Sequence, residues 1–186
     1  MSNVYVISDL HLGHKNILKF AGKYRGGATT VDEHDWALIS RIRSVCRSKR
    51  DLLYILGDVA MQVEKLELLN EIPARKILVR GNHDTFQDGV YRKYFDSIQG
   101  LVHKRYNSEG YWFSHAPIHP FELRGRRNVH GHVHANSILE DRLVPFSVRE
   151  RWESVPDSDY INVCVENCDG YPVNTAELET FKGVIS

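Results

Sequence analysis

The sequence predicts a layered α/β fold, and two observations carry this prediction. In the first half of the chain, short apolar runs that suit buried strands alternate with stretches whose apolar residues recur at helical spacing. Each of the first three apolar runs also stops abruptly at polar residues, and in such folds sites gather beyond the carboxyl ends of the strands. The 186 residues suffice for one domain with a sizeable core, so we expect a single domain over 1–186.

The first half of the chain supplies three strands and two helices. The strands are predicted at three short runs of mainly β-branched, leucine and tyrosine residues, namely 4–7, 52–56 and 77–79. The first helix begins at a capping box, Thr30 with Glu33, and its apolar residues repeat with helical period as far as Cys46. A shorter helix is predicted at 63–69 and closes at Pro73.

Beyond residue 97 the helical periodicity fades and strand-like runs take over. These runs are 98–102, 111–114, 128–130 and 160–165, and we expect them to form a second sheet packed against the first. Asn174 and Glu177 predict the cap of a final helix. The segment 137–158 has mixed charge and two prolines without a clear period, so we interpret it as an excursion of the same domain.

The composition excludes several classes of protein. With 42% hydrophobic and 26% charged residues, the chain matches globular rather than disordered proteins. Lys plus Arg and Asp plus Glu both total 24, so there is no global bias toward nucleic acid or an anionic membrane. The chain shows neither an apolar run of about 20 residues nor a secretory signal, so we expect a cytoplasmic protein with no membrane partner. Its three cysteines, at an odd count and without a C-x-x-C motif, are expected to be reduced structural thiols.

Residues that suit metal binding follow the first three predicted strands. Asp9 and His11 stand two apart, so at an extended strand end both side chains can share one cation. Asp58 follows an apolar strand, where a carboxylate is costly unless it caps a turn, pairs or binds a metal. The third strand leads into Gly-Asn-His-Asp at 81–84, where the glycine permits a tight turn before three polar side chains. Each motif alone also fits a cap or a turn, and their repetition favours a shared site.

Histidines in the second half of the chain extend this set. His115 follows the strand-like run 111–114. His132 and His134 occupy alternate positions after 128–130, a spacing that suits one metal or two neighbouring metals. Taken alone, each of these histidines is more often a hydrogen-bonded polar residue than a metal ligand. All of them follow predicted strands of one domain, however, and this favours a shared site.

Taken in order, these motifs resemble the signature of the calcineurin-like metallophosphoesterases, and 8–14 is similar to the small single-domain members of bacteria and phages. The resemblance implies a four-layer αββα sandwich of two mixed sheets flanked by helices. It also implies two divalent metals bridged by one carboxylate, with Asp9, His11, Asp58 and His134 on one metal and Asp58, Asn82, His115 and His132 on the other. We expect Mn²⁺, with Fe, Zn, Ni or Co as alternatives, because mixed oxygen and imidazole ligands select weakly among these ions.

The same resemblance implies the reaction, which is hydrolysis of a phosphate ester by a metal-bridging hydroxide. His83 would act as the general acid on the leaving oxygen, and Asp84 would orient the His83 imidazole. Substrate contacts are predicted for Arg80, His14 and Arg124, although an ordinary surface role is the alternative for each.

The substrate expected from the resemblance is a phosphodiester or a small nucleotide ester, and nucleic acid falls within this class. One alternative is a phosphomonoesterase, such as a serine/threonine protein phosphatase, which would use the same metals and His83. The other is a non-catalytic interaction module on the same fold. Such modules tend to lose ligands or the histidine acid, whereas this chain has every one of them.

Overall fold

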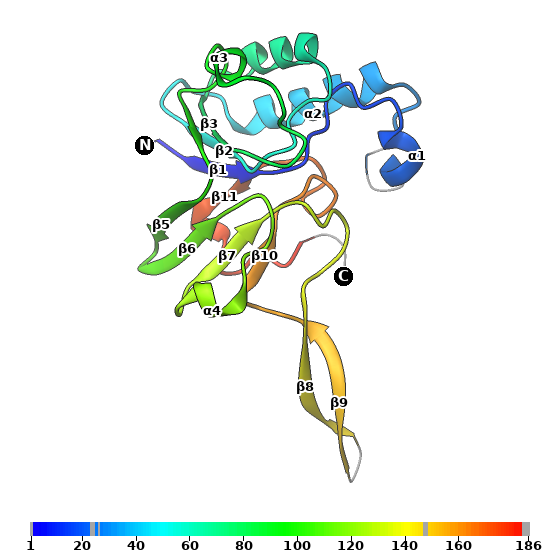
Figure 1. Cartoon of the computed structure of the whole chain (residues 1–186), viewed down its shortest axis with the longest axis vertical. Helices are drawn as coiled ribbons and strands as arrows, with labels where there is room; N and C mark the ends of the chain where they lie inside the picture. Colours follow the sequence, from blue (N-terminus) through cyan, green and yellow to red (C-terminus); the bar gives the residue numbers. More distant parts are fainter. Residues whose placement is uncertain (1, 23–24, 26, 147–148, 184–186) are drawn as a thin grey trace.

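Two sheets lie face to face, and a long hairpin projects away from them (Figure 1). The computed structural model describes residues 2–22, 25, 27–146 and 149–183. The larger sheet contains, in spatial order, β11 (Val173–Asn174), β1 (Val4–Ile7), β2 (Leu52–Ile55), β3 (Arg75–Val79) and β4 (Ser97–Gln99). The smaller sheet contains β10 (Tyr160–Asn162), β7 (Arg127–His130), β6 (Glu109–Phe113) and β5 (Val102–Tyr106).

Helices flank the sheets, as the predicted fold class requires. The outer side of the larger sheet carries α2 (Val31–Val45), the 3₁₀ helix η2 (Val63–Glu71) and α3 (Asp88–Tyr91), with α1 (Ile17–Ala21) beside them (Figure 1). The smaller sheet has a thinner cover, α4 (Pro120–Leu123), whose Leu123 carbonyl accepts a hydrogen bond from Trp112 Nε1 at 3.4 Å. The 3₁₀ turn η3 (Thr175–Glu177) follows β11. Both sheets contain parallel and antiparallel pairs, so the prediction of mixed sheets flanked by helices is confirmed.

The capping box predicted for the first long helix is present at the start of α2. The Thr30 side chain accepts a hydrogen bond from the Glu33 amide, and the Glu33 carboxylate accepts one from the Thr30 amide, both at 3.2 Å. Leu38, Ile39 and Ile42 form the buried face of this helix. A cap of this kind contributes about 1 kcal/mol, and burial of the apolar face supplies most of the remaining stabilisation.

Parallel pairing brings the carboxyl ends of β1, β2 and β3 to one edge of the larger sheet. Ile7 lies opposite Ile55, and Ile55 lies opposite Leu78, with all three side chains buried. The loops that follow these strands are themselves bonded, because the His11 amide donates to the Asp58 carbonyl at 2.9 Å. The predicted convergence of the strand-end motifs therefore takes place on a rigid edge.

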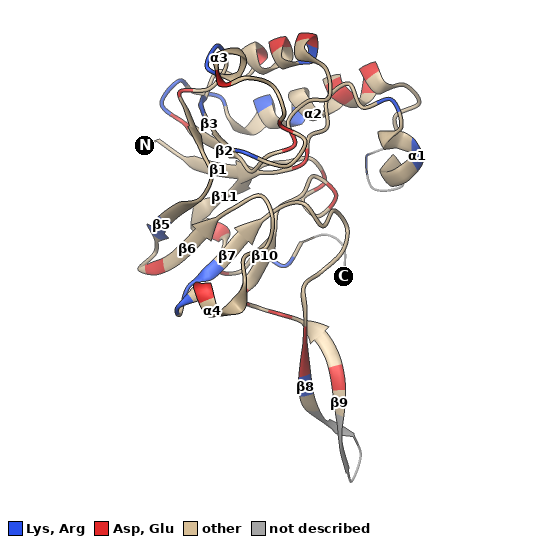
Figure 2. Ribbon diagram, in the orientation of Figure 1, with Lys and Arg blue, Asp and Glu red and all other residues tan. Residues whose placement is uncertain are grey.

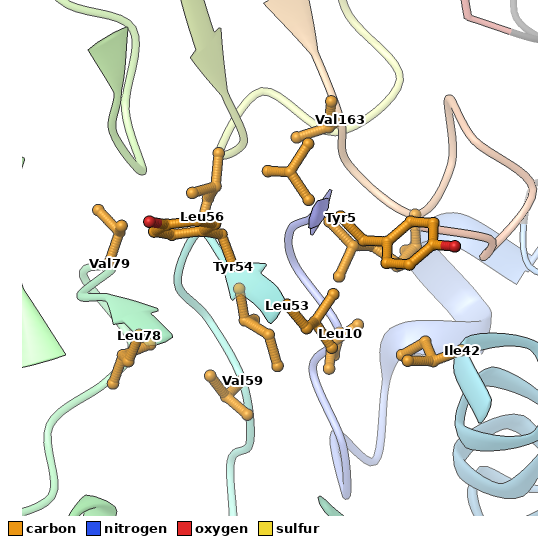
Figure 3. Packing of buried hydrophobic residues seen from close by; sticks show 14 of the residues in the cluster. Tyr5, Leu10, Ile42, Leu53, Tyr54, Leu56, Val59, Leu78, Val79 and Val163 are labelled. Carbon is orange, nitrogen blue, oxygen red and sulfur yellow. The ribbon is translucent and has the colours of Figure 1, made fainter. Parts of the chain in front are cut away.

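The core between the sheets is built from apolar side chains of both (Figure 3). Tyr54 of β2 meets Phe113 of β6 edge to face, with ring centroids 5.1 Å apart. Leu56 and Val163, from the segments that follow β2 and β10, are completely buried beside them. This packing fixes the second sheet, and the histidines that follow its strands, against the edge that carries the aspartates.

Two predicted strands end earlier than the sequence suggested. The run 98–102 is divided between β4 and β5, which belong to different sheets, so the chain crosses between the layers at this point. The run 160–165 stops pairing as a strand at Asn162, and Cys164 instead forms an isolated bridge with Ser8 across the two layers. Apolar runs show that a segment is buried, but the partner strand is chosen by the packing of the layers.

Two predicted helices also differ from the structure. The helix expected at 63–69 is the 3₁₀ helix η2. The final helix is the short turn η3, in which the Asn174 side chain caps the Ala176 amide at 3.0 Å without Glu177 completing a box.

The segment 137–158 forms an antiparallel arm, which the sequence did not predict. It consists of β8 (Leu139–Phe146) and β9 (Arg149–Pro156), and it extends away from both sheets (Figure 1). A hydrogen bond from the Asp157 amide to the Ile138 carbonyl, at 2.8 Å, closes its base. The segment does leave the two sheets, and none of the residues of the arm whose burial is described belongs to the core cluster, which explains why its strands lack a clear pattern.

Charges of both signs are interspersed over the helical side of the molecule (Figure 2). This distribution agrees with the equal totals of acidic and basic residues, so recognition of an anionic substrate depends on local geometry. In the part of the chain that the structure describes, no helix combines the length and the apolar character needed to cross a membrane.

Candidate metal centre

The backbone at the strand-end loops is held in an unusual conformation. Nine non-glycine residues in the described part of the chain have positive φ, and five of them are predicted ligands: Asp9 (60°), His11 (51°), Asp58 (54°), His132 (71°) and His134 (52°). A left-handed conformation costs about 1–2 kcal/mol for such residues and clusters at functional sites. The surrounding structure therefore keeps these side chains in place against their local preference.

Glycines permit the loops to approach one another. A Cβ at Gly131 would lie 1.9 Å from Ser8 Oγ and 2.2 Å from Asp9 Oδ2. A Cβ at Gly81 would lie 2.4 Å from Asp58 Oδ1. Both glycines precede predicted ligands, so the Gly-His and Gly-Asn pairs of the motifs are explained by close packing rather than by flexibility alone.

One group of potential ligands comprises Asp9, His11 and His134, whose donor atoms lie within 4.8 Å of one another. The His11 and His134 rings are stacked with centroids 5.2 Å apart. Asp9 Oδ1 and both ring nitrogens of His11 are buried and have no hydrogen-bond partner among the described residues. Buried polar atoms left without partners are costly, so this donor set fits a cation that would satisfy them.

A second group comprises Asp9, Asp58 and His115, again with donor atoms within 4.8 Å. His115 Nε2 lies 3.5 Å from Asp58 Oδ2, and Asp58 Oδ2 lies 3.7 Å from His11 Nε2. Asp58 is thus placed between the two groups, as the predicted bridging role requires. Asp9 also reaches both groups, whereas the family resemblance implied a place in the first alone.

Asn82 and His132 complete the second group. Asn82 Oδ1 lies 2.7 Å from His115 Nε2 and 3.0 Å from His132 Nδ1. The His132 amide donates to Asp9 Oδ2 at 2.9 Å, which ties the loop after β7 to the loop after β1. All seven predicted ligands are therefore brought together, from strand ends of both sheets.

The electrostatic environment keeps the Asp9 carboxylate ionised. Burial raises the pKa of Asp9, but the nearby His11 and His115 imidazoles and the His132 amide outweigh burial and hold this pKa well below its usual range. Cys164 donates its thiol to Asp9 Oδ2 at 3.2 Å, and burial raises the pKa of this thiol, so it remains a protonated donor. The three cysteines of the chain are free and buried, as predicted.

A cleft of about 450 Å³ opens beside the first group. Its lining includes four histidines and several small or apolar side chains, namely Ile17, Phe20, Ala21 and Ala135. His83 is exposed in this cleft, with its ring centroid 5.7 Å from that of His11, and its amide donates to Asp58 Oδ1 at 2.9 Å. His14 also lines the cleft, where burial lowers its pKa, so this predicted substrate residue is close to the ligands.

Asp84 has a different place from the one predicted. Its Oδ2 accepts hydrogen bonds from the Asp58 and Gly81 amides at 2.9 and 2.8 Å, and its Oδ1 accepts one from the Val59 amide at 3.0 Å. Tyr91 OH donates to Oδ1 as well. The predicted contact between Asp84 and the His83 imidazole is absent from the described structure, because the carboxylate instead holds the loops after β2 and β3 together.

The two arginines predicted to contact substrate are engaged elsewhere. Arg80 donates to the Asp84 carbonyl at 3.1 Å, pairs with Asp88 at 2.5 Å and lies over the Tyr91 ring, so it braces the loop that carries His83. Arg124 is an exposed residue at the end of α4, where it pairs with Glu122 at 3.4 Å. The structure does not bring Arg124 among the ligands, because α4 lies on the outer side of the smaller sheet (Figure 1).

The sequence reasoning missed two buried charged residues next to the first group, Glu166 and Arg25. Glu166 directly follows the apolar run 160–165, as Asp58 follows 52–56, so the strand-end signal was present in the sequence. Arg25 gave no such signal, because it stands in a segment without apolar periodicity.

Comparison with known proteins identifies the family of this chain and several relatives. The family model described as calcineurin-like phosphoesterase matches residues 2–165. Uncharacterized protein MJ1445 of Methanocaldococcus jannaschii is 31% identical over 179 residues, covering 94% of this chain and 88% of the relative. Gene 66 protein of Mycobacterium phage L5 is 31% identical over 176 residues, covering 77% of this chain and 83% of the relative.

Solved structures share the fold. A protein of unknown function from Aquifex aeolicus, AQ665, aligns with a TM-score of 0.72 at 24% identity, covering 98% of this chain and 100% of that one. A structure described as a novel archaeal phosphodiesterase aligns with a TM-score of 0.50 at 13% identity, covering 91% of this chain and 86% of that one. At these identities the likeness shows a common architecture.

Proposed function

We propose that this chain, which belongs to the calcineurin-like phosphoesterase family and is a metal-dependent phosphoesterase, hydrolyses phosphodiesters or small nucleotide esters at the cleft beside His83. The observation that carries the proposal is the convergence of seven potential ligands next to that cleft, with buried donor atoms that lack a partner among the described residues. Such a set of oxygen and imidazole donors suits two first-row divalent ions, of which we favour Mn²⁺.

When bound, two divalent ions would polarise the phosphoryl oxygens and activate water at neutral pH. The residues of the chain prepare this chemistry. Asp58 lies between the two ligand groups and would be shared by both ions. Its other oxygen accepts the His83 amide, so the carboxylate that is shared also fixes the backbone of the proposed acid.

His83 is the residue best placed to handle the leaving group. Its side chain is exposed in the cleft, next to His11, and it lies outside both groups of potential ligands. An imidazole in this position would donate a proton to the departing alkoxide. Asp84 would act as a positioning residue, because through the Gly81 and Asp58 amides it ties the loop that carries His83 to the loop after β2. His14, which lines the same cleft with its ring centroid 5.7 Å from that of His11, would contact the substrate.

The wall of the cleft supports an ester with an organic group beyond the phosphate. Ile17 and Phe20 of α1 line the cleft together with the histidines, so a nucleoside or similar group can lie against an apolar surface while its phosphate faces the ligands. A phosphomonoesterase is the second candidate, since it would use the same ligands and His83. The convergence of every ligand and the exposure of His83 favour an enzyme over a non-catalytic module.

The test is a matched assay of the protein reconstituted with Mn²⁺. Bis(nitrophenyl) phosphate and dinucleotides represent the diesters, and nitrophenyl phosphate and nucleoside monophosphates represent the monoesters. We expect kcat/KM to be at least about tenfold higher on the diester of each pair, and chelation to abolish turnover. Preference for the monoesters would support the phosphatase instead. Two bound metals without turnover of any ester would support the interaction module.

A further inference from the structure

A buried ion pair lies directly behind the first ligand group. Arg25 Nε and Nη2 donate to the same oxygen of Glu166, Oε1, at 2.9 and 2.6 Å. Both side chains are completely buried. Removing two such charges from water is expensive, and the cost is repaid only when the remaining polar atoms are satisfied as well. Glu166 Oε2 has no partner among the described residues, so stability alone does not account for the pair.

Glu166 is in contact with a potential ligand. Its Oε1 lies 3.1 Å from His134 Nδ1. Because a carboxylate can only accept, Nδ1 carries the proton in this contact, and the lone pair of Nε2 is left for a metal. The main chain of His134 is held too, since its carbonyl accepts hydrogen bonds from Asn162 and Asn167, both at 2.7 Å. His134 is thereby fixed in its left-handed conformation with a defined tautomer.

Arg25 connects this contact to the loop after β1. Its Nη2 donates to the Asp9 carbonyl at 2.9 Å, and its Nη1 donates to the Leu10 carbonyl at 3.1 Å. These carbonyls belong to the segment that carries two potential ligands, Asp9 and His11. A single guanidinium therefore sets the distance between the loop of Asp9 and the carboxylate that orients His134.

The hydrogen-bond network of Arg25 also extends away from the ligands to His34, and it fixes the tautomer of this histidine. Arg25 Nη1 lies 3.1 Å from His34 Nε2, and His34 Nδ1 lies 3.0 Å from Asp35 Oδ1. Because arginine has no acceptor, Nε2 of His34 accepts and its Nδ1 donates. Asp35 in turn accepts the Gly13 amide at 3.0 Å, which returns the network to the loop after β1.

We propose that Glu166 is a positioning residue of the first ligand group. Held in place by Arg25, Glu166 presents His134 Nε2 to the metal and fixes the spacing between His134 and Asp9. The inference rests on the proposed function. Outer contacts of this kind orient ligands and typically change metal affinity by a factor of about 10 to 100 when removed. The ligands that belong to the second group alone, Asn82, His115 and His132, make no hydrogen bond with Glu166 or Arg25 in the described structure.

The decisive experiment titrates metal-free protein with Mn²⁺ by calorimetry and with Co²⁺ by visible absorption. For Glu166→Gln we expect one of two sites to weaken by about 10- to 100-fold with an altered Co²⁺ spectrum, while the other changes less than about threefold. Glu71→Gln is the matched control, because Glu71 is an exposed glutamate that pairs with Arg43 far from the site. It should leave both sites and the spectrum unchanged.

The outcomes separate this proposal from the function itself. Equal weakening of both sites, or no weakening of either at an unchanged melting temperature of the metal-free protein, overturns the role of Glu166. Failure of the unaltered protein to bind two metals overturns the proposed metal centre instead. If Glu166→Gln does not fold, Glu166→Asp keeps the charge for Arg25 but withdraws the carboxylate from His134 by one methylene, and the same loss at a single site is expected.

Discussion

Single residues at the strand ends combine an unfavourable backbone with a buried charge. Asp9 and Asp58 both have positive φ and almost no exposure to solvent. Each is stabilised by contacts that a different side chain would lose, such as the bond from the His132 amide to Asp9. Residues that combine two such costs cluster at functional sites, which agrees with the proposed role of Asp9 and Asp58 as metal ligands.

The first prediction at this scale concerns Asp58. Asp58→Asn keeps the shape of the side chain but removes the charge between His11 and His115, so affinity should fall at both metal sites. We expect kcat/KM to fall by more than about 100-fold, which exceeds the loss of about 10- to 100-fold that is typical when a residue that only contacts a metal ligand is changed. Metal analysis and steady-state kinetics test this, with Asp169→Asn, at an exposed aspartate, as the control. Full turnover with full metal content would rule out a bridging role.

The second prediction at the residue scale concerns His83. His83→Ala keeps the amide that bonds to Asp58, so both metals should stay while kcat falls by about 10²- to 10⁴-fold. The loss should be larger for a nucleotide ester than for a nitrophenyl ester, because an alkoxide needs protonation more than a phenolate does. Rates on both esters, measured where chemistry is limiting, provide the test. Equal losses would indicate charge stabilisation without proton transfer, and loss of metal would exclude His83 as the acid.

Whole elements differ in how much they contribute to the core. α2 buries three apolar side chains and has a complete capping box, whereas none of the described residues of β8 and β9 belongs to the core cluster. Leu143 and Trp152 lie opposite each other on the arm and are 49% and 70% exposed, so even their pairing hides little apolar surface. An isolated hairpin of this kind is marginally stable in water.

We therefore predict that the arm can be removed. Replacing 140–155 with a short Gly-Ser turn should change the free energy of unfolding by less than about 1 kcal/mol, because the Asp157–Ile138 hydrogen bond already holds the two ends together. Urea denaturation measures the change. As a control for sensitivity, Thr30→Ala, which removes the cap of α2, should cost about 1 kcal/mol. A loss of several kcal/mol on removing the arm would show that it is part of the cooperative unit.

At the scale of the whole molecule, the potential metal ligands come from both sheets. Asp9, Asp58 and Asn82 come from loops of the larger sheet, whereas His115 and His132 follow strands of the smaller one. Ions bound at this junction would therefore stabilise the packing of the layers in addition to serving the reaction.

Metal binding should accordingly raise the melting temperature. At Mn²⁺ concentrations about 100 times the dissociation constant, binding at one site contributes about 2.7 kcal/mol. For a chain of this size that corresponds to an increase of roughly 5–10 °C. Calorimetric scans over a range of Mn²⁺ concentrations, with reversal by chelator, measure it. A melting temperature that does not depend on Mn²⁺ would contradict the idea that the ions join the sheets.

The sequence by itself determined the features that depend on neighbouring residues. The α2 capping box, the buried runs of β1 to β3 and the polar motifs that end them are local patterns, and together they predicted the fold class and a shared site. These predictions succeeded because helix caps, side-chain alternation and strand ends are governed by residues a few positions apart.

Tertiary structure alone decided which distant groups meet. In the folded chain, the Asp84 carboxylate accepts hydrogen bonds from backbone amides instead of contacting the His83 imidazole, and Glu166 pairs with Arg25, which is 141 residues away. Tertiary structure also divided the run 98–102 between the two sheets. Hydrogen-bond partners and strand neighbours are selected by the packing of whole layers, in which most buried polar atoms find a complementary group from a distant part of the chain, and no local pattern encodes that choice.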